Sequence, residues 1–354
     1  MIALLDLQDA STFPSRRDED WKYTDVRRWL REVPPPSPSA AVQGGGPFFG
    51  LGGEALTFVN GTAVGADHST AFGDQIVRLR FVSDANDTGH SAVATIGVRP
   101  GGHLTLLESH EGHGSGYVCH NRLIIQVPAG ARVERIVLVD EPEDALSVTQ
   151  AEVTLGQGGA YSQTILTTGA KLQRLETRLK HPGEGAAVRI DAAYLLAGKR
   201  HADLTTEVDH VGGEGQTDQL TKGVVRDEAR GVFQGRIIVR EGADGTDARM
   251  GHHALITSDR GEVDAKPELE IYADDVSCAH GNTIGALDES ALFYMEQRGI
   301  PTDEARALLT QAFLMQVVDR IDHDGARERC RAWLDDHLDP FSPRGRRWAA
   351  EPLG

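Results

Sequence analysis

The stretch at residues 128–139, PAGARVERIVLV, places a glycine turn directly before an apolar strand. Similar turns occur at residues 100–102 (PGG), 156–158 (GQG) and 182–185 (PGEG). Their last glycines recur about every 28 residues, and a fixed period of this length is typical of stacked structural repeats. In such a solenoid each coil buries its apolar face only against its neighbours. The repeated turn therefore predicts a stack of similar coils.

The segments that follow these turns have the character of β-strands. The expected strands are residues 103–108, 132–139, 160–167 and 187–194, with earlier ones at 56–59 and 77–81. Residues 136–139 are continuously apolar, as expected of a strand packed on both faces. Because little helical periodicity occurs between residues 90 and 285, the repeat predicts a parallel β-helix over residues 55–285. A β-sandwich with similar turn spacing is the alternative.

The two ends of the chain are expected to be helical. Residues 15–32 predict a helix that starts at Ser15, and a Pro- and Gly-rich linker completes an N-terminal segment, residues 1–54. Residues 286–354 form the expected C-terminal helical domain. Asp288 caps its first predicted helix, an apolar stripe runs from Ala305 to Ile321, and residues 339–354 are expected to be loose.

The composition excludes several classes of protein. The 354 residues include 53 Asp and Glu against 36 Lys and Arg, a net charge of −17. Such a charge disfavours binding to nucleic acid or anionic lipid. Only three cysteines occur, which is no disulfide framework and fits a reducing compartment. With neither a signal peptide nor an apolar run of about 18–20 residues, the sequence predicts a cytoplasmic protein.

One pair of residues stands out as candidate chemistry. Cys278 and His280 are two residues apart, so on a strand they would share one face. Thiolate and imidazole are ligands that iron and zinc accept. Two ligands make only half a metal site, and the alternative interpretation is a buried structural cysteine beside a surface histidine.

Other candidate motifs fail on their spacing. His110 and His113 are three residues apart in a glycine-rich stretch, unlike the HExxH of zinc proteases. We expect His201, His210 and His252 to be solvated loop histidines. Gly198-Lys199 lacks the flanking residues of a phosphate-binding loop, so we do not expect ATP hydrolysis. A secreted-type β-helix enzyme acting on polysaccharide is a rival that the cysteines disfavour.

Residues 267–300, PELEIYADDVSCAHGNTIGALDESALFYMEQRGI, resemble the C-terminal signature of the SufB/SufD family of iron–sulfur cluster assembly proteins. A second match lies in residues 233–240, FQGRIIVR, and 245–248, GTDA. Residues 19–24, EDWKYT, are similar to the N-terminal motif of SufD-type rather than SufB-type members. Two positions depart from the family: Ala279 replaces a common serine, and residue 282 is asparagine rather than alanine.

The resemblance implies a mainly β protein with a right-handed parallel β-helix (solenoid) core between helical ends, which decides against the sandwich. It also implies a non-enzymatic scaffold subunit that works with SufB and the ATPase SufC. In that case His280, with Cys278 as an auxiliary, would handle metal or sulfur at the SufB interface. We expect Glu270 and Tyr272 to lie in the same interface region.

Further expectations rest on the same resemblance. The iron–sulfur cluster would be transient and shared with SufB, so the isolated chain would hold none stably. SufC would dock on the C-terminal helices, where Gln297, Gln311 and Arg320 are expected to point outward. The alternatives are a SufB-like subunit that holds the cluster, or an interaction scaffold without ligand chemistry. Flavin binding by the complex and a homodimer of the isolated chain stay open.

Overall fold

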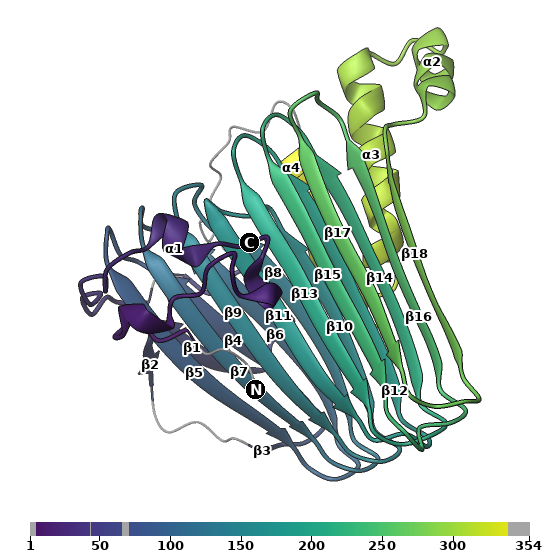
Figure 1. Ribbon diagram of the computed structural model, residues 1–354. Coiled ribbons are helices and arrows are strands. Elements are labelled where there is room, and N and C mark those ends of the chain that lie inside the picture. Colours follow the sequence, from purple (N-terminus) through teal and green to yellow (C-terminus); the bar gives the residue numbers. More distant parts are fainter. Residues whose placement is uncertain (1–4, 43, 66–70, 339–354) are drawn as a thin grey trace.

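The computed structural model describes residues 5–42, 44–65 and 71–338 (Figure 1). The protein is mainly β, with 49% strand and 16% helix, and its centre is a parallel β-solenoid of about 7 turns. The predicted solenoid is thereby confirmed, and the sandwich alternative is wrong. The expected loose end, residues 339–354, lies outside the described residues, as do residues 1–4 of the N-terminal segment.

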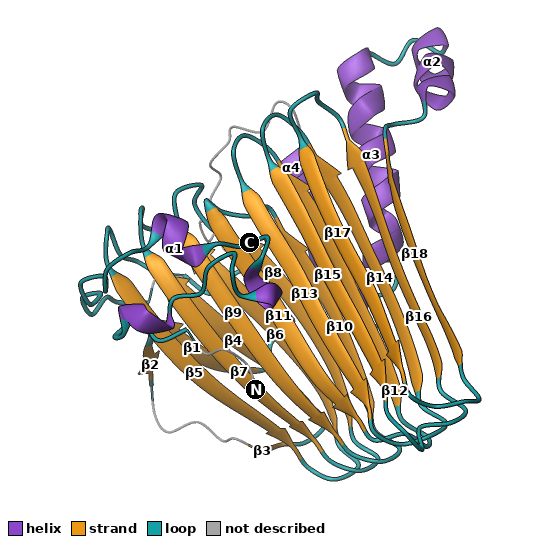
Figure 2. Ribbon diagram, viewed as in Figure 1, coloured by secondary structure: helices purple, strands orange, loops and turns teal. Residues whose placement is uncertain are grey.

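The solenoid consists of two sheets, which we call the long sheet and the short sheet (Figure 2). The long sheet has ten strands, namely β1 (Glu54–Val59), β2 (Thr62–Val64), β4 (Gln75–Ser83), β6 (His103–Gly112), β8 (Arg132–Asp140), β10 (Ala160–Thr167), β12 (Ala187–Leu196), β14 (Gln216–Val225), β16 (Asp247–Ile256) and β18 (Ser277–Gly285). The short sheet has eight, namely β3 (Ala71–Phe72), β5 (Gly89–Val98), β7 (Val118–Val127), β9 (Leu146–Leu155), β11 (Leu172–His181), β13 (His201–His210), β15 (Arg230–Val239) and β17 (Glu262–Ile271).

The chain passes alternately between the sheets, so each coil contributes one strand to each. Apart from the antiparallel pair β1–β2, neighbouring strands run parallel. The turns before β8 and β10 place Gly130 at φ 67 and Gly158 at φ 63, a left-handed conformation that favours glycine. The repeated glycine is thus explained by the turn that opens a long-sheet strand.

The main core lies between the two sheets. Leu79 and Leu106 of the long sheet and Ile96 and Ile125 of the short sheet have no exposed surface. They occupy alternate positions of their strands, as the pleat requires. Complete burial of one such side chain contributes about 1.5–3 kcal/mol. Repetition of these layers along the axis holds the coils together.

The N-terminal segment is less helical than its sequence predicts. Instead of one helix over residues 15–32, only η2 (Glu19–Trp21) and the single turn α1 (Val26–Trp29) are helical there, and η1 (Ala10–Thr12) and η3 (Phe49–Leu51) are equally short. Trp21 and Val26 are both buried, in an apolar cluster that includes Leu146 and Leu172 of the short sheet. Packing onto the sheet has overridden local helix propensity, so that prediction was wrong.

Three helices follow the solenoid: α2 (Glu289–Gln297), α3 (Thr302–Val318) and α4 (Asp324–Leu338). Asp288 caps α2 as predicted, accepting hydrogen bonds from the backbone of Ser290 and Ala291. Side chains of α3 and α4, including Leu314 and Trp333, pack with outward-facing residues of the long sheet. Figure 1 shows α2 projecting beyond the end of the sheets. Within the described ranges, no helix has the length and apolar character needed to cross a membrane.

Candidate functional site

The last coil of the solenoid, β17 with β18, has neighbours on one side only. β17 pairs with β15, and β18 pairs with β16, so each ends its sheet (Figure 1). Every residue of β17 and β18 is at least partly exposed. An exposed strand edge presents backbone groups that another chain can pair with. The solenoid therefore ends in an open coil, and the candidate residues lie on it.

Cys278 and His280 share one face of β18, as their spacing predicts. They stand opposite Ala248 and Met250 of β16, which are 0% and 2% exposed and point into the space between the sheets. The same register directs Cys278 and His280 toward that space. No later coil among the described residues covers them, so Cys278 is only partly buried and His280 is exposed. The pair is therefore inward-facing yet accessible.

The Cys278 thiol is not activated in the isolated chain. Burial raises its pKa, and the nearby carboxylate of Asp247 raises it further. Since the thiolate is the reactive and metal-binding form, this environment keeps the sulfur protonated at neutral pH. A cation brought to the open coil would favour the thiolate.

The donor set at this coil fits part of a metal site. Cys278 supplies one sulfur and His280 one imidazole nitrogen. Among the residues that the structure describes, no group of three or more His, Cys, Asp or Glu side chains is placed to hold a metal ion. Iron–sulfur clusters generally take four protein ligands. A cluster at this pair would therefore need donors from another molecule.

A chain of hydrogen bonds from the solenoid interior anchors β18 beside this pair. Nδ1 of His252 donates a hydrogen bond to Oδ1 of Asn282 at 2.7 Å, and Nε2 of His252 lies 3.0 Å from the Tyr194 hydroxyl. The His252 ring stacks on Phe233 with centroids 4.7 Å apart. Burial lowers the pKa of His252 to about 4, so the ring is neutral and can donate from one nitrogen and accept at the other. The unusual asparagine thus fixes the strand two residues after His280.

Glu270 and Tyr272 lie at the outer side of the same coil. Glu270 stands 3.5 Å from Arg236, and the Tyr272 hydroxyl donates to the Glu270 carboxylate at 3.4 Å. The Tyr272 side chain is 59% exposed. Both residues are therefore accessible at the end of the short sheet.

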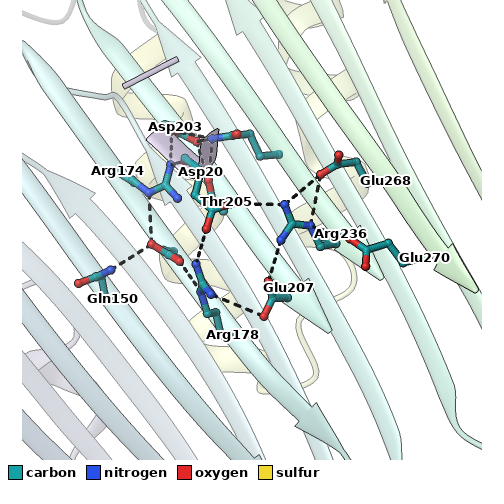
Figure 3. Close-up of polar contacts among 12 residues, drawn as sticks. Asp20, Gln150, Arg174, Arg178, Asp203, Thr205, Glu207, Arg236, Glu268 and Glu270 are labelled. Atoms are coloured by element: carbon teal, nitrogen blue, oxygen red, sulfur yellow. Dashed lines mark hydrogen bonds and ion pairs between the residues drawn. The ribbon is translucent and has the colours of Figure 1, made fainter. Parts of the chain in front are cut away.

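A polar network that the sequence did not reveal crosses the outer face of the short sheet (Figure 3). At its centre Arg174, which is fully buried, lies 2.8 Å from Asp203 and 3.3 Å from Glu176. Farther along, Arg236 lies 3.3 Å from Glu207 on β13 and 3.3 Å from a carboxylate of β17. The network therefore links strands β11, β13, β15 and β17. Its only sequence signal is the run of alternating charges on β11.

The SufD-type motif of the N-terminal segment covers this network. Asp20 lies 3.2 Å from Arg178 and 3.3 Å from Arg236, and the Trp21 ring lies over Arg174 at 4.2 Å. Burial raises the pKa of Asp20, but the charges of Arg178 and Arg236 outweigh this effect and lower it overall. Residues 19–24 and 233–240, the two segments whose sequences resemble the family, are thus in direct contact through Asp20 and Arg236.

The helical positions expected to bind a partner differ in their surroundings. Gln297 is exposed at the end of α2, close in sequence to Phe293 and Tyr294, which are 62% and 59% exposed. Gln311 is half-buried and donates a hydrogen bond to Asp335 of α4. Among the described residues of this domain, the exposed aromatic side chains are therefore on α2.

Arg320 does not point outward, so that expectation was wrong. Its guanidinium lies 3.0 Å from Asp191 and 2.6 Å from Asp218, both on the outer face of the long sheet. Burial raises the pKa of Asp191 to about 7, although the charge of Arg320 opposes this. Arg320 thereby joins the end of the α3 region to the solenoid, and its replacement would disturb the fold.

Several histidines expected in solvated loops are in fact buried on strands. His110, His210 and His252 face the solenoid interior, and His201 lies beneath the N-terminal segment. Burial lowers the pKa of His210 to about 3. The prediction failed because the alternation of a solenoid strand buries every second residue, polar or not.

The family model for the SufBD core domain of SUF system FeS cluster assembly matches residues 81–313, more than half of the chain. The chain belongs to the SufB/SufD family. That matched region contains most of the solenoid, the Cys278/His280 pair and α2.

Its relatives place the chain on the SufD side of the family. SufD of Escherichia coli is 33% identical over 218 residues, 61% of this chain and 51% of the relative. SufD of Bacillus subtilis is 32% identical over 147 residues, 42% of this chain and 34% of the relative. A SufBD family protein of Mycobacterium bovis is 24% identical over 364 residues, 94% of this chain and 91% of the relative. The chain thus spans about half the length of the first of these relatives, and it is SufD-like.

Proposed function

We propose that this chain is a non-enzymatic scaffold subunit for iron–sulfur cluster assembly, acting in the cytoplasm with SufB and the ATPase SufC. The observation that carries the proposal is the open coil: Cys278 and His280 face inward where no described coil covers them. A scaffold that receives a cluster needs soft ligands that a partner can reach. Membership of the SufB/SufD family supports the same role.

The cluster is the cargo in this proposal, shared for a time between subunits. His280 supplies a ligand or handles sulfur, and Cys278 assists it. The remaining donors come from SufB, because the described part of this chain offers one sulfur at the site. This donor count favours a SufD-like role over a SufB-like subunit that holds the cluster by itself.

The exposed surface at the open coil supports a protein partner there. Ile271 and Ile284 are 42% and 44% exposed on the last strands. A solenoid end of this kind is normally capped or paired. We assign this end, together with Glu270 and Tyr272, to SufB, and a second copy of the chain could pair through it when SufB is absent.

SufC is assigned to the C-terminal helices. Phe293 and Tyr294 project from α2 into solvent, and Gln297 lies on the same helix. Exposed aromatic side chains of this kind mark interaction surfaces. Gln311 and Arg320 contact α4 and the solenoid instead, so α2 is the better place to test the assignment.

The decisive experiment is co-expression with SufB and SufC, followed by anaerobic reconstitution with iron and sulfide. His280→Ala should lower the acid-labile sulfide of the complex, whereas His103→Ala, at an exposed histidine in the fourth strand of the long sheet, should leave it unchanged. The isolated chain should carry little cluster. A near-stoichiometric cluster on the lone chain, or full assembly by the His280→Ala complex, would contradict the proposal.

The two partner surfaces can be tested separately. Cysteines introduced as Glu270→Cys and Tyr272→Cys should crosslink to SufB in the assembled complex. Phe293→Asp and Gln297→Arg should weaken capture of SufC without lowering the melting temperature of the chain. Crosslinks confined to one chain, or unchanged SufC capture by both variants, would remove the respective assignment.

A further inference from the structure

A basic groove lies between the N-terminal segment and the turns that lead into the short sheet. It has a volume of about 830 Å³. Cationic side chains outnumber carboxylates in its lining by eight to four, the reverse of the balance in the whole chain, where 53 Asp and Glu face 36 Lys and Arg. A concentration of positive charge in a strongly acidic protein requires an explanation.

The groove continues into a second hollow of about 430 Å³. The two hollows share Arg16, Asp25 and Arg28, and the second adds Arg17, Arg27 and Arg31. The positive surface is therefore longer than a single pocket for a small anion.

Several of these charges are not held in ion pairs. Within the part of the chain that the structure describes, Arg16, Lys22, Arg28 and Lys171 form no ion pair with a carboxylate. By contrast, Arg260 on the same groove lies 2.9 Å from a carboxylate oxygen of its neighbour along the stack. Gathering like charges that form no ion pairs costs folding free energy, so this set of cations is better explained by a ligand than by stability.

Trp29 lines the groove. Its side chain is 44% exposed, with the Arg28 guanidinium 5.1 Å and the Lys171 ammonium 4.9 Å from its ring centroid. An accessible tryptophan flanked by cations is typical of the anchors that dominate protein interfaces. A nucleobase stacked on this ring would have to displace one of the two cations, which disfavours a nucleotide.

The shape of the groove follows the axis of the solenoid. The turns after β10, β12 and β16 bring Lys171, Lys199 and Arg260 to its lining. Neighbouring strands of one sheet are about 4.8 Å apart, so these side chains are spaced along several coils. Such a row fits an extended segment better than a compact molecule.

We propose that the basic groove binds an extended acidic segment of a partner protein. Carboxylates of that segment pair with Arg16, Lys22, Arg28 and Lys171, and an apolar residue packs on Trp29. Because the rest of the chain is acidic, an acidic partner is repelled elsewhere and steered to this groove. The site uses neither Cys278 nor His280, so it does not depend on the function proposed above.

The test is fluorescence anisotropy on the full-length chain with a labelled peptide rich in Asp and Glu that carries one central Phe. The variant Arg16→Glu/Arg28→Glu/Lys171→Glu reverses three groove charges. The matched control, Arg99→Glu/Arg132→Glu/Arg249→Glu, reverses three exposed arginines outside it. The groove variant should bind at least about tenfold more weakly than the wild type, and the control should differ by less than about threefold.

Further measurements separate the groove from general charge effects. Trp29→Ala should weaken binding several-fold at unchanged charge, and raising the salt from about 50 to about 300 mM should weaken the wild type most. If charge reversal lowers the melting temperature, the neutral variant Arg16→Gln/Arg28→Gln/Lys171→Gln replaces the reversed one in the binding assay. Equal binding by groove and control variants, no peptide binding at low salt, or tighter binding of a single-stranded oligonucleotide than of the peptide would each overturn the proposal.

Discussion

The middle and the last coil of the solenoid share one architecture but differ in what covers them. On the outer face of the middle coils, the side chains of Arg174 and Asp203 are both 0% exposed beneath the N-terminal segment. Toward the end, Arg236 and Glu270 are 25% and 40% exposed in a contact of the same chemical type. A solenoid coil depends on its neighbours for burial, so the difference arises from position rather than composition.

This difference separates stability from binding. Buried ion pairs on the covered coils cannot be disturbed without leaving an uncompensated charge in the protein. The contacts of the last coil are solvated, so they can rearrange when a partner arrives. A partner can therefore bind at the open coil with the smallest loss of folding stability.

The largest effect on stability is expected from the buried ion pair between Arg174 and Asp203. Asp203→Asn should lower the free energy of unfolding by about 3–5 kcal/mol, because the buried Arg174 loses its nearer carboxylate, at 2.8 Å, and keeps only that of Glu176, at 3.3 Å. The matched change Glu270→Gln on the last coil should cost about 0–1 kcal/mol. Urea denaturation of both variants measures the contrast, and equal losses would show that burial does not distinguish the two coils.

The tryptophans of the N-terminal segment provide the next contrast. Trp21 is 2% exposed and covers the network, whereas Trp29 is 44% exposed. Trp21→Ala should destabilise the chain by about 3 kcal/mol, and Trp29→Ala by at most about 1 kcal/mol. Thermal melting of the two variants gives the comparison. If Trp29→Ala destabilised the chain more than Trp21→Ala, Trp21 would not be the residue that covers the polar network.

The sequence predicts the long sheet better than the short one. Each long-sheet strand from β8 to β12 follows a turn with a left-handed glycine, and this signal locates the strand. Short-sheet strands such as β11 also follow a left-handed glycine, here Gly169 at φ 74, but they carry outward charges, including Arg174, that hide their apolar face. The motif around Trp21 has helical spacing, yet its contacts are with residues about 150 positions later in the chain.

The candidate site was predictable only in part. The spacing of Cys278 and His280 places them on one face, because a strand repeats every two residues. Their exposure could not be predicted, since it depends on where the stack of coils ends. The link between Asn282 and His252 joins residues 30 positions apart, and a single sequence gives no sign of which residues pair at that distance.

Buried histidines predict a smaller, pH-dependent effect near the last coil. The pKa of His252 is about 4 in the fold and about 6.5 in an unfolded chain. Below pH 6.5 the unfolded chain takes up a proton that the fold does not, so stability present above 6.5 is lost as the pH falls toward 4. This histidine alone should account for up to about 1.4 kcal/mol per pH unit.

The measurement is urea denaturation at pH 7 and pH 5. His252→Gln should flatten the pH dependence, and His103→Gln, at an exposed site, should not. Asp191 acts in the opposite direction, because its folded pKa of about 7 lies above its usual 3.8 and its contribution is lost as the pH rises through 7. Because the wild type and His252→Gln both contain Asp191, its contribution cancels when their pH dependences are compared. An unchanged slope in His252→Gln would mean that this ring is already charged in the fold.

The smallest effect on stability, and the most direct view of the open coil, concerns the three cysteines. Cys119 and Cys330 are 0% exposed, whereas Cys278 is only partly buried on the last strand. Iodoacetamide should therefore modify Cys278 first in the native chain, with Cys119 and Cys330 reacting only on unfolding. Because burial raises the pKa of Cys278, its rate should be lower than that of a free thiol and should increase with pH.

Mass spectrometry of the alkylated chain identifies the modified residue and the order of reaction. Modification should leave the melting temperature nearly unchanged, since the open coil can accommodate added volume that a closed core cannot. If Cys119 or Cys330 reacted as fast as Cys278, the solenoid interior would be opening as readily as its end. The contrast between covered and open coils would then be one of dynamics rather than of position in the stack.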